Sequence, residues 1–134
     1  MNILFLCVAN SARSQMAEGI AKNIFKGCSD INVQSAGSKP ASVHPLAIKV
    51  LQEMNIDISK QYSKSVADID LSKVDYIITL CADEICPYVA SPVVKEHWPF
   101  EDPAQPDMNS SKESQLGRFR KIRDLLKRKY FFIF

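Results

Sequence analysis

The sequence predicts an α/β fold in which a single four-stranded parallel sheet is flanked by helices. Three observations lead to this prediction. Short, continuous apolar runs of strand length alternate with longer segments whose apolar residues recur at helical spacing. Such alternation is typical of a parallel sheet that packs against helices. The length of 134 residues suits one hydrophobic core, and no linker, repeat or low-complexity stretch divides the chain, so we expect one domain over residues 1–134.

The first half of the chain predicts two strands separated by a helix. Residues 2–7 form a short apolar run that is typical of a buried strand. Residues 14–25 place their apolar side chains on one helical stripe, with Ser14 as the expected cap and Gly27 as a stop signal. Residues 31–35 form the second strand, which is expected to end at Gly37 and Pro40.

The second half continues the alternation. Pro45 suits the first turn of a second helix, and three prolines between residues 99 and 106 indicate a loop before the last helix. The expected elements are a helix over 44–54, a helical turn over 66–71, strands over 75–80 and 93–98, a loop over 99–111 and an amphipathic helix over 111–129.

The composition excludes several classes of protein. The chain is 46% hydrophobic and 24% charged, which is typical of a globular protein rather than a disordered one. The net charge of +2 is too small to argue for a nucleic-acid partner, and the basic residues between 118 and 129 alternate with apolar ones as on a solvated helix face. No apolar run is long enough to span a membrane and no signal peptide is recognisable, so we expect a cytoplasmic protein with reduced cysteines.

The most informative motif begins at Cys7, where the first strand meets the first helix. A cysteine, five intervening residues and Arg13 form a loop whose backbone N–H groups can cradle an oxyanion. The helix N-terminus and the guanidinium add positive charge, and the same field favours the thiolate of Cys7 over the thiol. We therefore interpret Cys7 as a nucleophile. The residues expected to surround the oxyanion are Val8, Ala9, Asn10, Ser11, Ala12, Arg13 and Ser14.

Two details of this loop are specific. Asn10 accepts the left-handed backbone angles that would turn successive N–H groups inward. Ser14 is placed to donate a hydrogen bond to the Cys7 sulfur. The alternative interpretation is that Cys7 is a buried core cysteine and that Arg13 forms a surface ion pair. For either residue alone, this alternative would be preferred.

Two further segments fall at the same edge of the predicted sheet, where open α/β sheets bind ligands. Asp102 precedes Pro103 on an aromatic-flanked loop and suits a general acid, because partial desolvation favours its protonated form. Alone, it would be an Asp-Pro turn without chemistry. Cys81 and Cys86 follow the third strand and indicate that electrons leave through a thiol relay. The alternative is a small core residue and a chance loop thiol.

The remaining candidates point to structural roles. Cys28 follows Gly27 on an expected surface turn and is interpreted as incidental. No Cys-x-x-Cys pair exists, which argues against a tetracysteine metal site. His44 and His97 are interpreted as a helix-start residue and a partly buried structural histidine.

Together these motifs resemble the thioredoxin-coupled arsenate reductases, which share the low-molecular-weight tyrosine phosphatase fold. The cysteine loop is common to both activities, whereas the Ser-Gln-Met-Ala-Glu run, the second cysteine pair and the alanine after Asp-Pro favour the reductases. The resemblance covers most of the chain to about residue 104 and rests on residues 7–19, Ser35-Ala36-Gly37, Ile56-Asp57-Ile58-Ser59, Val74-Asp75, Thr79-Leu80-Cys81, Glu96-His97-Trp98 and Asp102-Pro103-Ala104.

This resemblance implies a mechanism. Arsenate binds in the loop against the backbone amides and Arg13, the Cys7 thiolate attacks arsenic, and Asp102 protonates the departing oxygen. Cys81 then attacks Cys7 and releases arsenite, Cys86 attacks Cys81, and thioredoxin reduces the resulting Cys81–Cys86 disulfide.

The chain departs from the family at positions beside the loop. Some members bind potassium there through an asparagine, a glutamate, a serine and an aspartate. Asn10, Glu18 and Ser35 match the first three, but Lys64 stands at the aspartate position, where its ammonium can replace the charge of the metal. We therefore expect no metal and no cofactor. Ala9 stands where the family usually has glycine, which restricts the backbone.

Two other functions compete with arsenate reduction. One is a low-molecular-weight protein tyrosine phosphatase that hydrolyses phosphoesters through a cysteinyl-phosphate. The other is a non-catalytic module that binds an oxyanion. We expect a monomer that binds arsenate or phosphate and thioredoxin, and no nucleic acid or membrane.

Overall fold

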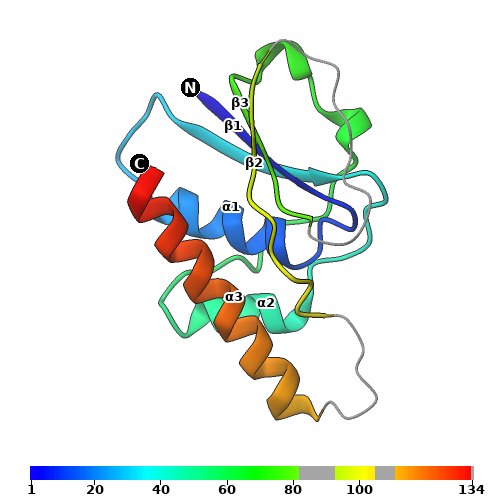
Figure 1. The fold of residues 1–134 in the computed structure, drawn as a ribbon. Coiled ribbons are helices and arrows are strands. Elements are labelled where there is room, and N and C mark those ends of the chain that lie inside the picture. Colours follow the sequence, from blue (N-terminus) through cyan, green and yellow to red (C-terminus); the bar gives the residue numbers. More distant parts are fainter. Residues whose placement is uncertain (82–92, 105–110, 134) are drawn as a thin grey trace.

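A four-stranded parallel sheet forms the centre of the molecule, with strand order β2-β1-β3-β4 (Figure 1). The computed structural model describes residues 1–81, 93–104 and 111–133. The predicted α/β fold with one four-stranded parallel sheet is confirmed. Its elements are β1 (Asn2–Cys7), α1 (Arg13–Ile24), β2 (Asn32–Gly37), α2 (Pro45–Gln52), the 3-10 helices η1 (Val66–Asp68) and η2 (Leu71–Lys73), β3 (Tyr76–Thr79), β4 (Val94–His97) and α3 (Lys112–Ile133).

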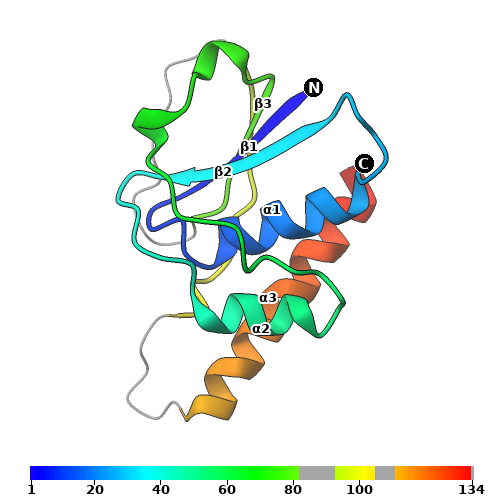
Figure 2. The same ribbon diagram turned by 180° about the vertical axis from the view of Figure 1, so that it is seen from behind.

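The two faces of the sheet are covered differently. Successive side chains of a strand point to opposite faces. Ile3 and Phe5 of β1 pack into the larger core against the three α-helices, which contact one another on that face. Leu4 and Leu6 pack into a smaller core under the segment that holds η1 and η2. Figures 1 and 2 show the helices on one side of the sheet and the 3-10 helices on the other.

Strand β1 is central, and its register sets the geometry of one edge of the sheet. Cys7 at its end pairs with Gly37 of β2, and Leu6 pairs with Thr79 of β3. Because all strands are parallel, the carboxyl ends of β1, β2 and β3 meet at this edge. The loops that follow Cys7, Gly37 and Thr79 therefore start side by side.

Helix α1 begins differently from the prediction, whereas helix α2 begins as expected. Helix α1 begins at Arg13, and Ala12 at its N-cap makes no side-chain cap, so the expectation that Ser14 caps this helix is wrong. The Ser14 hydroxyl contacts a sulfur atom instead, as described below. Helix α2 starts as expected, with Pro45 in its first turn and the His44 ring nitrogen Nδ1 accepting a hydrogen bond from the Leu46 amide at 3.1 Å.

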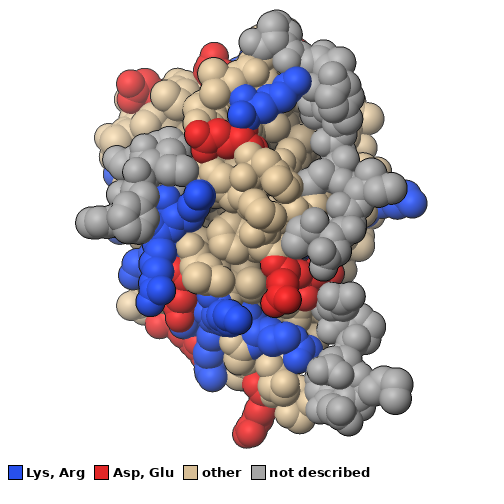
Figure 3. All heavy atoms as spheres, viewed as in Figure 1, with Lys and Arg blue, Asp and Glu red and all other residues tan. Residues whose placement is uncertain are grey.

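Helix α3 buries one stripe and exposes the other. Phe119, Ile122 and Leu126 lie in the larger core, while lysines and arginines interspersed with acidic side chains occupy the outer face (Figure 3). The guanidinium groups of Arg120 and Arg123 both bind the carboxylate of Glu53 at the end of α2. The N···O distances are 2.7 and 2.8 Å. These hydrogen bonds lower the pKa of Glu53 from 4.5 to about 2. In the described chain every helix is too short or too polar to cross a membrane.

Candidate active site

The loop between β1 and α1 turns its carbonyl groups outward. Three of its oxygens accept hydrogen bonds from backbone amides of the segment after β2: Val8 from Lys39 at 2.9 Å, Ala9 from Ala41 at 3.0 Å and Ser11 from His44 at 2.9 Å. In a trans peptide the N–H points opposite to the carbonyl. The amides that follow these carbonyls therefore face the other side of the loop, as an oxyanion cradle requires.

The Cys7 sulfur lies at the base of this cradle. The residue is 2% exposed, and its thiol is free. Its Sγ is 2.8 Å from the Ser14 hydroxyl and accepts a hydrogen bond from the Asn10 amide at 3.2 Å. The predicted contact between Ser14 and the sulfur is confirmed. The Ser14 hydroxyl and the Asn10 amide thus converge on one buried sulfur.

Asn10 gives the loop its shape. Its φ of 48° lies in the left-handed region, as predicted. Its side-chain nitrogen donates to Ser14 at 2.8 Å and to Ser35 at 2.9 Å. Its side-chain oxygen accepts from Gln15 at 3.0 Å and from the Lys64 amide at 2.9 Å. Both polar atoms of the Asn10 side chain are therefore hydrogen-bonded to other parts of the chain. These contacts hold the residue in its left-handed conformation.

Most of the contacts that support Asn10 come from residues without a local sequence signal. Gln15 is buried and also donates to the Asn10 carbonyl at 3.0 Å, and the Ser63 hydroxyl donates to the same carbonyl at 2.7 Å. The segment 61–64 lies about 50 residues away along the chain, and no local pattern links it to the loop. Gly37 was expected only to end a strand. A Cβ there would lie 2.4 Å from the Val8 carbonyl oxygen, so the loop needs glycine at this position.

Arg13 is buried at the start of α1 and is 5% exposed. Its Nη1 donates to the carbonyl of Phe100 at 2.8 Å and, at 3.4 Å, to that of Leu80. The guanidinium thus connects the oxyanion loop to the residue that follows β3 and to the segment that follows β4. The expected grip of Arg13 on an oxyanion stays a prediction.

Asp102 lies on that same segment and is half-buried. Its Oδ1 accepts a hydrogen bond from the Ala104 amide at 3.0 Å. Burial lowers the pKa of His44, and the charge of nearby Asp102 opposes that shift. Since the His44 amide binds Ser11, Asp102 lies close to the oxyanion loop.

Cys81 follows β3 at the same edge. Its neighbour Leu80 donates to the Leu6 carbonyl at 3.0 Å, so the chain at Cys81 runs beside the end of β1. Cys81 is 1% exposed and is disulfide-bonded. Cys86 lies outside the described residues. The structure therefore brings Cys7, Arg13, Cys81 and Asp102 to one edge of the sheet, as predicted.

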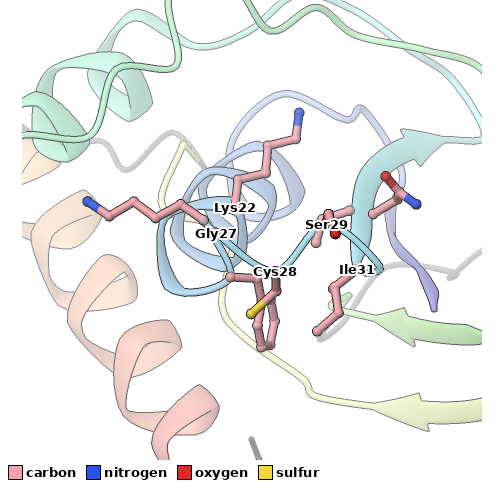
Figure 4. A pocket seen from close by; sticks show the side chains of 9 residues that line it. Lys22, Gly27, Cys28, Ser29 and Ile31 are labelled. Atoms are coloured by element: carbon pink, nitrogen blue, oxygen red, sulfur yellow. The ribbon is translucent and has the colours of Figure 1, made fainter.

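The residues interpreted as incidental lie elsewhere or serve the fold. Cys28 is an exposed free thiol that lines a cavity of about 580 Å³ with Lys22 and Ser29, just beyond α1 (Figure 4). The 12 residues of α1 separate this cavity from the loop by roughly 18 Å. His97 is exposed rather than partly buried, and its Nδ1 is 2.7 Å from the Thr79 hydroxyl.

The described residues contain no group of three or more His, Cys, Asp or Glu side chains placed to hold a metal ion. The position next to Glu18, where the resemblance raised the question of potassium, is occupied by an ammonium. Lys64 Nζ is 3.7 Å from one carboxyl oxygen of Glu18, and Lys22 Nζ is 2.7 Å from the other.

Comparison with known proteins gives a consistent set of relatives. A family model described as low molecular weight phosphotyrosine protein phosphatase matches residues 2–131. Arsenate reductase 1 of Staphylococcus saprophyticus subsp. saprophyticus is 42% identical over 127 residues, covering 93% of this chain and 89% of that protein. A solved arsenate reductase in the phosphate binding state has a TM-score of 0.78 at 34% identity and covers 96% of this chain and 92% of its own. A thioredoxin-dependent arsenate reductase of Corynebacterium glutamicum has a TM-score of 0.66 at 28% identity, covering 98% of this chain and 61% of that one.

Proposed function

Because the chain belongs to the low molecular weight phosphotyrosine protein phosphatase family, we propose that it reduces arsenate to arsenite through Cys7 and a thiol–disulfide relay. The phosphatase loop alone does not distinguish reduction from hydrolysis, since both reactions begin with attack by the same sulfur. The observation that carries the proposal is Cys81, a buried, disulfide-bonded cysteine beside the end of β1. Hydrolysis of a cysteinyl-phosphate needs water and an acid and uses no second thiol.

The first step forms a bond between sulfur and arsenic. Arsenate enters the cradle of loop amides beside Arg13, and the Cys7 thiolate attacks the arsenic atom. One oxygen leaves as water after Asp102 supplies a proton. Asp102 suits this role because it lies near His44, whose amide binds the oxyanion loop, and because the Ala104 amide holds its carboxyl group in place.

The second step moves two electrons to arsenic. The Cys81 thiolate attacks the Cys7 sulfur, a Cys7–Cys81 disulfide forms, the sulfur–arsenic bond breaks, and its electron pair leaves with arsenite. Arsenic passes from the pentavalent to the trivalent state as two thiols become one disulfide. Cys86 then attacks Cys81, which restores the Cys7 thiol. A dithiol of thioredoxin reduces the final disulfide.

The pairing of the cysteines is compatible with this relay, since Cys81 is disulfide-bonded while Cys7 and Cys28 are free thiols. We further propose that the protein acts as a cytoplasmic monomer and that thioredoxin is its partner, as for the Corynebacterium glutamicum relative.

Matched cysteine variants test the proposal. Arsenite formation is measured with thioredoxin, thioredoxin reductase and NADPH, and hydrolysis of p-nitrophenyl phosphate is measured in parallel. We expect Cys7→Ser to lose both activities, Cys81→Ser to lose only arsenate reduction, and Cys28→Ser to behave as the wild type. Continued arsenate turnover by Cys81→Ser would reject the relay. Phosphoester hydrolysis by wild-type protein that reduces no arsenate would identify a phosphatase, and oxyanion binding without any product would identify a binding module.

A further inference from the structure

The turn that carries Asp102 is held by two arginines from different helices. Arg13 at the start of α1 donates through Nη1 to the carbonyl of Phe100 at 2.8 Å. Arg118 of α3 donates through Nε to the carbonyl of Pro103 at 3.5 Å, and Pro103 is buried. These two carbonyls lie on either side of Asp102 along the chain. The oxyanion loop and α3 therefore both hold the backbone that carries this carboxyl group.

One of the two hydrogen bonds beyond Phe100 connects this turn to another element. Between described residues, the Ala104 amide donates to Asp102 Oδ1 at 3.0 Å, but this bond is local and moves with the turn. The other is the bond from Arg118 to Pro103. Phe100 and Ala104 pack against the larger core, and such apolar contacts have no preferred direction. The direction in which the Asp102 carboxyl group points thus depends on Arg118.

Arg118 occupies this place at a cost to stability. Its Nη1 donates to Ser114 Oγ at 3.3 Å, but its Nη2 is buried without a hydrogen-bond partner among the described residues. A buried charged donor that is left unpaired destabilises the folded state. Arg120 and Arg123 on the same helix are instead paired with Glu53. An unsatisfied group that folding does not favour indicates a role other than stability.

We propose that Arg118 is a positioning residue that ties the Asp102 turn to α3 and so fixes where the Asp102 carboxyl group lies relative to the oxyanion loop. This inference rests on the proposed function, in which Asp102 is the general acid. A general acid must lie within hydrogen-bond reach of the oxygen that it protonates, and a displacement of about 1 Å can slow a reaction by about 100-fold. Loss of this single tie should therefore change the rate of the reaction.

Two variants of equal side-chain length separate the hydrogen bond from the bulk of the side chain. In Arg118→Gln the amide nitrogen takes the position of the arginine Nε, so it can still donate to Pro103. In Arg118→Met a methyl group takes that position and donates nothing. Both variants remove the unpartnered Nη2, so neither should lower the urea concentration at the unfolding midpoint. The control is Arg120→Met on the same helix, because the Arg120 side chain is 46% exposed and binds Glu53 instead of the turn.

The first measurement is the hydrogen exchange of the Ala104 amide, followed by NMR in fully reduced protein. This amide donates to Asp102, so its exchange becomes faster when the turn opens more often. We expect exchange to be about tenfold faster in Arg118→Met than in the wild type. In Arg118→Gln and Arg120→Met it should stay within about threefold of the wild-type rate.

The second measurement is the rate of arsenite formation in a single turnover, with Asp102→Asn as the reference. We expect Arg118→Met to be about tenfold slower than the wild type and Arg118→Gln to stay within about threefold of it. The arsenate concentration at half-maximal rate should change by less than about twofold, because the loop that binds arsenate is unchanged. The double variant Asp102→Asn, Arg118→Met should be at most about twofold slower than Asp102→Asn, since Arg118 acts through that carboxyl group.

Three results would overturn the proposal. They are wild-type exchange of the Ala104 amide in Arg118→Met, turnover by Arg118→Gln as slow as that of Arg118→Met, and equal slowing by Arg118→Met in the wild-type and Asp102→Asn backgrounds. Failure of the proposed function gives a different result, namely wild-type protein that forms no arsenite or an Asp102→Asn variant that forms it at the wild-type rate. The exchange of Ala104 reports on the tie to α3 whichever reaction the protein catalyses.

Discussion

Replacing Ser14 by alanine removes a single hydroxyl from the buried sulfur and tests how the loop activates Cys7. The Ser14 oxygen lies 2.8 Å from Cys7 Sγ, and among the described residues the Asn10 amide is the other hydrogen-bond partner of that sulfur. A hydrogen bond to a charged group contributes about 1.5–3 kcal/mol, and about 1.4 kcal/mol corresponds to a factor of ten. We therefore expect Cys7 of Ser14→Ala to react more slowly at neutral pH, by a factor of up to about 100.

The fold should tolerate this change. Asn10 loses one acceptor but keeps Ser35, so the free energy of unfolding should fall by only about 1 kcal/mol. The assay is the rate of Cys7 alkylation at fixed pH together with the rate of a single arsenate turnover.

Ser63→Ala is the matched control. It removes a hydroxyl that binds the Asn10 carbonyl at 2.7 Å and that is not among the hydrogen-bond partners of the sulfur within the described residues. This variant should keep its alkylation rate within about twofold while losing comparable stability. Wild-type alkylation in Ser14→Ala, or equal slowing in both variants, would refute the reasoning.

Three further predictions address the loop, the surface and the cation. Gly37→Ala places a Cβ 2.4 Å from the Val8 carbonyl oxygen, so phosphate affinity measured by calorimetry should drop at least tenfold; unchanged affinity contradicts the packing argument. Glu53 has its pKa lowered from 4.5 to about 2 by Arg120 and Arg123, so its stabilising effect is present above pH 4.5 and lost as the pH falls towards 2. The difference in unfolding free energy between the wild type and Glu53→Gln should shrink across that window, and a constant difference would refute it. Arsenate turnover should be equal in potassium and sodium salts of the same ionic strength, and strong dependence on potassium contradicts the expectation that no metal is needed.

Short-range patterns predicted most of the fold. The continuous apolar run of β1 and the stripe of α1 each depend on neighbours within a few residues, and both elements lie within two residues of their expected bounds. The position of Cys7 and Arg13 on either side of one turn followed from the same local pattern. Even the left-handed angle of Asn10 could be expected, since asparagine tolerates it better than most residues.

Long-range contacts could not be predicted in the same way. Ser14 looked like a helix cap because serine favours that position, but the Cys7 sulfur and Asn10 compete for its hydroxyl and hold it inside the first turn. The support from Ser63 and Lys64 depends on how a distant segment crosses the end of β2. Hydrophobic periodicity carries no information about that crossing.

The most direct test of the account is the location of the disulfide after one turnover. Fully reduced protein is given one equivalent of arsenate without any reductant, trapped with an alkylating reagent and digested for mass mapping. We expect one equivalent of arsenite, a Cys81–Cys86 disulfide, and alkylated thiols at Cys7 and Cys28. Unchanged arsenate with four alkylated cysteines, or arsenite formed while Cys81 remains a thiol, would contradict it.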